Sequence, residues 1–124
     1  MTEEQFGQWV IDNYNVEVEF DSSNSTRTPD GMNHGTITLR REGHKKSFDY
    51  QWVDRAGLPN TSHGTIICGF IFDWSAYEND KQEAFDNMET IEMWESYVDE
   101  IQFLETIFTE DEKGIIFNES TNFY

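Results

Sequence analysis

Basic residues are scarce in this 124-residue sequence: eight lysines and arginines stand against 25 aspartates and glutamates, and the formal net charge is −17. Nucleic acids and anionic membranes attract proteins through positive charge, so this balance argues against direct binding to either. Long apolar runs are missing as well, and no stretch approaches the roughly 18 residues that a membrane-spanning helix needs. The sequence therefore predicts neither a nucleic-acid ligand nor a membrane span.

Cysteine occurs once, at Cys68, which excludes an intramolecular disulfide. Cys68 lies in the apolar run Ile66–Phe72, where we expect a buried structural thiol. The alternative is a reactive thiol, but the run contains no basic residue that would lower its pKa. Residues 1–5 have neither the basic nor the apolar region of a secretory signal, so we expect a cytosolic protein.

Motifs for catalysis, metal binding and phosphate binding are missing too. His34, His44 and His63 lack the close His and Cys spacing of a zinc site, and no glycine-rich phosphate loop is present. Carboxylates are so numerous that any pair of them resembles a general acid and base by coincidence. We therefore predict a protein that is not an enzyme and has no catalytic residues, metal or cofactor.

Aromatic residues are abundant by contrast, at 15 % of the chain, and their bulk makes a folded core feasible. The length favours a single domain over residues 1–124. Acidity is uneven within it: residues 1–72 hold ten acids and six bases, a net charge of −4, whereas residues 73–124 hold fifteen acids and two bases, a net charge of −13. We interpret this asymmetry as one acidic face of one domain.

Hydrophobic periodicity predicts a helix and three strands in residues 1–61. Thr2 and Gln5 form a capping-box pattern ahead of apolar residues at helical spacing. Alternation predicts strands over residues 16–20, 35–41 and 45–52, with the last two joined in a hairpin. Residues 22–34 are rich in Ser, Asn, Thr, Pro and Gly, which predicts a long loop that is either flexible or used for contact.

Residues 62–124 are predicted to be helical and strongly acidic. Residues 62–74 are ambiguous, because Thr61 suits a helix cap while Thr65–Ile67 suits a strand, and we favour the helix. Helices are then expected over residues 81–88, from residue 89 or 90 to 108, and after a capping box at residues 109–112. The predicted fold class is α+β, with a small three-stranded antiparallel sheet and helices packed on one face.

The long acidic helix carries the clearest functional signal. On a helical wheel its carboxylates lie opposite the apolar stripe and repeat about once per 5.4 Å turn, which is comparable with the phosphate spacing along a nucleic-acid strand. Like charges at i,i+3 and i,i+4 destabilise a helix, and almost no lysine or arginine is interleaved here. Two readings stay open: an ordinary solvated face, and a surface that binds a cationic partner.

The residues proposed to bind such a partner come from this helix and the shorter one before it. Phe103 is included because wheel geometry puts it near the acidic side, where it would stack on a partner arginine. The alternative for Phe103 is packing beneath the last helix or the carboxy-terminal tail. The acids of residues 73–80 and 110–112 extend the acidic row. The predicted partner-binding residues are Glu83, Asp86, Glu89, Glu92, Glu95, Asp99, Glu100 and Phe103.

A small basic cluster stands at the predicted hairpin tip and consists of Arg40, Arg41, Lys45 and Lys46. On its own such a cluster suits contact with phosphate. The preferred reading is that it keeps the protein soluble or forms ion pairs with the protein's own acids.

The order of these segments resembles small uncharacterised proteins of bacteriophages and other mobile elements. The similar segments are Val16–Phe20, Pro29–Gly31, Thr36–Arg40, Phe48–Tyr50 and Phe108–Glu110. In composition and size the chain also resembles anti-CRISPR and anti-restriction inhibitors, several of which are acidic DNA mimics. The resemblance favours a helix over residues 62–74 and transfers no binding residue.

The resemblance implies an inhibitor of host defence, in particular an anti-CRISPR protein in the cytoplasm of the bacterial host. Its acidic helices would occupy the cationic nucleic-acid channel of a CRISPR effector or restriction nuclease and exclude target DNA. One alternative is an immunity protein or antitoxin that neutralises a basic nuclease toxin. Another is an inhibitor that binds an effector outside its DNA groove, through residues 22–34.

Overall fold

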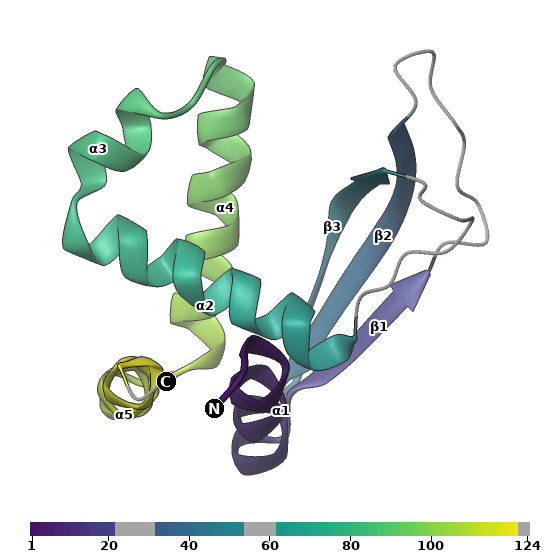
Figure 1. Cartoon of the computed structure of the whole chain (residues 1–124), viewed down its shortest axis with the longest axis vertical. Helices are drawn as coiled ribbons and strands as arrows, with labels where there is room; N and C mark the ends of the chain where they lie inside the picture. The colour runs from purple at the N-terminus through teal and green to yellow at the C-terminus, as the bar shows by residue number, and fades with distance from the viewer. Residues whose placement is uncertain (22–31, 54–61, 122–124) are drawn as a thin grey trace.

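The computed structural model describes residues 1–21, 32–53 and 62–121 (Figure 1). In this part of the chain a three-stranded antiparallel sheet of order β1-β2-β3 has helices gathered on one side, an α+β fold as predicted. The elements in chain order are α1 (Glu3–Tyr14), β1 (Glu17–Asp21), β2 (Met32–Arg41), β3 (His44–Val53), α2 (His63–Asn79), α3 (Lys81–Asp86), α4 (Ile91–Ile107) and α5 (Glu110–Ser120).

The β2–β3 hairpin follows from a two-residue turn. Arg41 pairs with His44, which leaves Glu42 and Gly43 between the strands. Both have positive φ values, 54° and 81°, as a type I′ hairpin turn requires. β2 begins at Met32, three residues before the predicted start, because the pairing with β3 continues that far. The rest of the predicted loop, residues 22–31, lies outside the described residues.

Side-chain caps set where the helices begin. The capping boxes predicted at residues 2–5 and 109–112 are both present. The segment over residues 62–74 is helical, as favoured, but its cap is Ser62 and not Thr61. A capping oxygen reaches the amide three residues onward, and Ser62 Oγ accepts a hydrogen bond from the Thr65 N–H at 3.2 Å.

One hydrophobic core joins the sheet to the helices, and α3 contributes Ala84 to it. Cys68 belongs to this core with 1 % of its surface exposed, so the prediction of a buried thiol is confirmed. Burial raises the pKa of that thiol to about 11, which keeps it protonated at neutral pH. The largest fully buried side chains are Trp74, Phe6, Leu39, Ile71, Ile101, Leu104 and Ile116.

Two glycines let α1 and α2 approach backbone to backbone. A Cβ atom added at Gly7 would lie 1.6 Å from the carbonyl oxygen of Gly64. One added at Gly64 would lie 2.3 Å from the carbonyl oxygen of Glu4. The α1–α2 crossing therefore depends on the missing side chains at these two positions.

Arg41 ties the end of the hairpin to three helices. Its Nε donates to the carbonyl oxygen of Tyr14 at 2.6 Å and its Nη1 to that of Ile107, at the carboxyl ends of α1 and α4. Nη1 and Nη2 also donate to the Glu112 carboxylate in α5 at 2.8 and 2.6 Å. A guanidinium is the side-chain group with enough fixed donors to make all these bonds.

The Arg41–Glu112 ion pair favours the interpretation that the basic cluster pairs with the protein's own acids. Arg41 is nearly buried, with 10 % of its side chain exposed, and its hydrogen bonds hold the pKa of Glu112 at about 2. Arg40 and Lys46 also pair with acids, Glu19 and Asp99. The cluster is therefore largely engaged by the protein's own carboxylates. Glu112, expected to extend the acidic row, is instead neutralised because the hairpin end packs against α5.

We predict that Gly7→Ala destabilises the protein by about 3 kcal/mol, because its methyl group forces the α1 and α2 backbones apart. Gly69→Ala is the matched control, since a Cβ there meets nothing within 4 Å. It should stabilise α2 by about 0.5–1 kcal/mol. Urea unfolding of both variants measures the difference, and equal stabilities would contradict the close helix crossing.

We also predict that Arg41→Ala lowers the free energy of unfolding by about 3–5 kcal/mol, because it removes the cation paired with Glu112 and the donor to two carbonyl oxygens. Arg40→Ala removes the neighbouring guanidinium, whose 3.6 Å pair with Glu19 is exposed, and should cost at most about 1 kcal/mol. Chemical denaturation compares the two. A similar small loss in both variants would mean that Arg41 does not hold the elements together.

Candidate functional site

Exposed carboxylates occur on α3, on the connection to α4 and on the first turns of α4. These elements lie at the end of the molecule opposite α1 (Figure 1). We call this surface the acidic ridge, and it consists of Glu83, Asp86, Glu89, Glu92 and Glu95. All five are exposed, and none has an ion pair within the described part of the chain. Five of the eight predicted residues are therefore exposed, on α3, on the connection from α3 to α4 and on the first turns of α4.

Capping bonds position the two helices that carry the ridge. Asp80 Oδ1 accepts a hydrogen bond from the Glu83 N–H at 3.0 Å, which begins α3. Thr90 Oγ1 accepts one from the Met93 N–H at 3.1 Å, which begins α4. Asp and Thr are favoured residues at helix N-termini, so Asp80 and Thr90 in the sequence indicate where the two helices begin.

Aromatic packing supports the ridge from behind. The Trp94 ring on α4 lies 6.1 Å from Tyr77 on α2 and 5.1 Å from Phe85 on α3, measured between ring centroids. It also stacks on Tyr97 at 5.8 Å. This cluster joins three helices, so the carboxylates project from a fixed scaffold.

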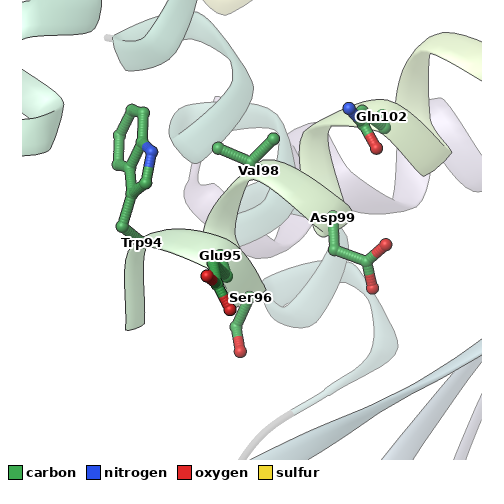
Figure 2. Close-up of a pocket in the computed structure, with 6 residues that line it drawn as sticks. All are labelled: Trp94, Glu95, Ser96, Val98, Asp99 and Gln102. Atoms are coloured by element: carbon green, nitrogen blue, oxygen red, sulfur yellow. The ribbon is translucent and has the colours of Figure 1, made fainter. Parts of the chain in front are cut away.

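Asp99 lies on α4 beyond the ridge and differs from the ridge residues in having a basic partner. Its Oδ2 lies 2.6 Å from the Nζ atom of Lys46 on β3. Together with Glu95 it borders a shallow hollow of about 460 Å³ on the outer face of α4. Figure 2 shows Trp94 and Val98 forming the apolar side of this hollow, apart from the carboxylates.

The predicted surface position of Glu100 is wrong. Glu100 lies on the inward side of α4 and shares a hydrogen bond with Asp73 of α2. Burial, together with the nearby charge of Asp73, raises the pKa of Glu100 to about 9. At neutral pH Glu100 is protonated and donates to Asp73. The pair therefore carries one charge in place of two, and neither residue belongs to the ridge.

The predicted exposure of Phe103 is also wrong. Only 9 % of its surface is exposed, and its ring centroid lies 6.0 Å from that of Phe48 on β3. The reason is that α4 packs against both α2 and the sheet, which makes its buried face wider than the apolar stripe. Phe103 therefore packs against the sheet. The alternative interpretation had placed it beneath the last helix or the carboxy-terminal tail.

Three exposed apolar side chains accompany the ridge and were missed by sequence reasoning. Phe85, Ile91 and Met93 are 42 %, 56 % and 46 % exposed. Ile91 and Met93 fall off the apolar stripe of the acidic helix, and that offset is the signal that would have indicated them. Aromatic and methionine side chains are enriched at protein interfaces, so Phe85 and Met93 are the part of this set that favours a protein partner.

Replacing Glu100 should change how stability depends on pH. The unfolded-state carboxyl ionises near pH 4.5 and the folded one near pH 9, so wild-type stability should fall as pH rises between these values. Glu100→Gln keeps a neutral donor that does not ionise, so it should be more stable than wild type at pH 8, by up to about 4 kcal/mol, with little difference at pH 5.

Urea unfolding at pH 5 and pH 8 measures this effect. Glu95→Gln is the control, because it also removes one carboxyl from α4 but from an exposed position. It should keep the wild-type pH dependence. The account of Glu100 fails if its glutamine variant loses stability between pH 5 and pH 8 as much as wild type does.

The described part of the chain has neither a metal-binding cluster nor a membrane-spanning helix. Residues 1–21, 32–53 and 62–121 hold no group of three or more His, Cys, Asp or Glu arranged to bind a metal ion. Within the same ranges, no helix has the length and apolar character of a membrane span. No family model, curated protein or solved structure matches this chain.

Proposed function

We propose that this protein binds a cationic nucleic-acid-binding protein and blocks its nucleic-acid site with the acidic ridge. The observation that carries the proposal is the set of five exposed carboxylates on α3, the start of α4 and their connection, none of which forms an ion pair among residues 1–21, 32–53 and 62–121. Negative charges held at intervals of about one 5.4 Å helical turn offer lysines and arginines a field like that of a phosphate backbone. Such a ridge competes with nucleic acid for the same basic groove.

The distribution of the basic residues favours a binding role over simple solvation. Of the six basic residues in the described part of the chain, Arg40, Arg41, Lys46 and Lys113 form ion pairs with the protein's own acids. None of those acids is on the ridge. Like charges one turn apart cost about 0.2–0.5 kcal/mol per pair, which an interleaved lysine would relieve. Solubility alone requires no such arrangement.

The exposed apolar side chains next to the ridge carboxylates add a packing surface, which charge alone does not provide. Phe85, Ile91 and Met93 offer surface for close packing, and packed apolar centres carry much of the affinity at protein interfaces. Charge would then steer the partner and set the orientation of the complex. The ridge thus has both an electrostatic and a packing component.

The proposed partner class is the CRISPR effector or restriction nuclease of a bacterial host. The support is the resemblance of segment order, size and composition to mobile-element inhibitors of host defence. In this role the ridge replaces target-DNA phosphates and excludes the DNA by competition. No catalytic step is required, so inhibition should be stoichiometric.

Reversing ridge charges should abolish partner capture. The variant Glu89→Lys/Glu92→Lys/Glu95→Lys is compared with wild type as bait in lysates of bacteria that carry CRISPR and restriction systems, at low and high salt. Wild type should retain basic nucleic-acid-binding proteins at low salt and release them at high salt, because each ion pair is screened. The reversed variant should retain none of them.

The matched control is Glu4→Lys/Asp12→Lys/Glu17→Lys, which changes the net charge equally on exposed residues of α1 and β1. It should capture the same proteins as wild type. Circular dichroism verifies that both triple variants are folded. Equal capture by the reversed ridge and the control would refute the proposed function.

A further inference from the structure

A cleft of about 760 Å³ opens next to the ridge, between α2, α4 and the β3 edge of the sheet. This volume lies within the range of about 300–1,000 Å³ that is typical of ligand sites. Apolar side chains and carboxyl groups both line it. The apolar ones are Ile37, Phe48, Ile66, Phe70 and Met93, and the carboxyls of α2 and α4 are Asp73, Glu92, Asp99 and Glu100.

The rim of the cleft already holds a cation. Lys46 reaches from β3 to Asp99, with its Nζ 2.6 Å from the carboxylate and 6.0 Å from the Phe48 ring centroid. A positive charge between a carboxylate and an aromatic face is a favourable arrangement. Lys46 and Asp99 are 33 % and 54 % exposed, so their pair is weak and open to replacement by another cation.

The cleft has an aromatic wall for the apolar part of such a cation. Phe48 and Phe70 lie 5.3 Å apart between ring centroids, on β3 and α2. Asp73 and Glu100 also line the cleft, where they share a hydrogen bond and one proton. The lining therefore combines an apolar wall with carboxylates, which matches a long side chain that ends in a positive charge.

We propose that the cleft receives an arginine side chain of the partner protein, whose guanidinium displaces Lys46 from Asp99 and whose stem packs on Phe48 and Phe70. Arginine fits better than lysine because its planar fork pairs with a carboxylate through two hydrogen bonds and stacks on aromatic rings. The inference rests on the proposed function for the identity of the partner, and it adds the specific group that is recognised beside the ridge.

The test uses Nα-acetyl-arginine-N-methylamide as the probe and ¹H–¹⁵N NMR of the whole chain. Saturable shifts are expected at amides that line the cleft, such as Ser47, Gly69 and Ser96. The citrulline analogue has the same shape without the charge and should give no such shifts. The lysine analogue should bind more weakly than the arginine probe.

The competitor lysine provides a sharper test. Lys46→Gln removes the internal cation and should tighten binding of the arginine probe by about two- to fivefold, the range of an exposed ion pair. Lys45→Gln makes the same change in net charge on a neighbouring exposed residue and should leave the affinity unchanged. Asp99→Asn should weaken binding, because it removes the receiving carboxylate.

Several outcomes would overturn the inference. These are equal tightening in the two lysine variants, equal binding of the lysine or citrulline analogue, and shifts at the α3 residues of the ridge, Glu83 and Asp86, in place of the cleft. The absence of saturable shifts up to about 50 mM probe, well above a millimolar dissociation constant, would do so too. No nucleic-acid-binding protein takes part, so failure here is distinct from failure of the charge-reversal test.

Discussion

The hydrogen bonds of the Arg41 guanidinium are the constraint on which the rest of the structure depends. This one side chain, at the end of the β2–β3 hairpin, donates hydrogen bonds to the carboxyl ends of α1 and α4 and to Glu112 in the first turn of α5. It thereby fixes the direction in which α4 leaves the sheet. Since α4 carries two of the five ridge carboxylates, Glu92 and Glu95, their position depends on a contact at the other end of that helix.

The same contact explains how so acidic a chain distributes its charge. Basic residues are few, and the structure uses Arg41, Lys46 and Lys113 to join separate elements. Glu100 avoids repulsion differently, by keeping its proton beside Asp73. Among the described residues, charge is thus neutralised where elements meet, and the carboxylates on α3 and at the start of α4 have no ion pair. The negative charge of the ridge is therefore a consequence of where the few basic residues are placed.

Local features of the fold were predictable, and contacts between distant segments were not. Short stretches of sequence determine the capping boxes, the alternating strands and the exposed glutamates at the start of α4. Glu100 and Phe103 were misplaced because a helical wheel assumes one buried stripe, whereas α4 packs on both α2 and β3. The pairing of Arg41 with Glu112 links residues 71 positions apart, and no local pattern indicates it.

The most direct measurement of the central claim is whether a partner can hold duplex DNA and this protein at the same time. Sedimentation of fluorescently labelled DNA with a captured nucleic-acid-binding protein, in the presence of increasing amounts of this chain, distinguishes the two cases. Competition for one groove predicts that the label returns to the position of free DNA as the chain is added in stoichiometric amounts. A stable complex of all three components would contradict the account.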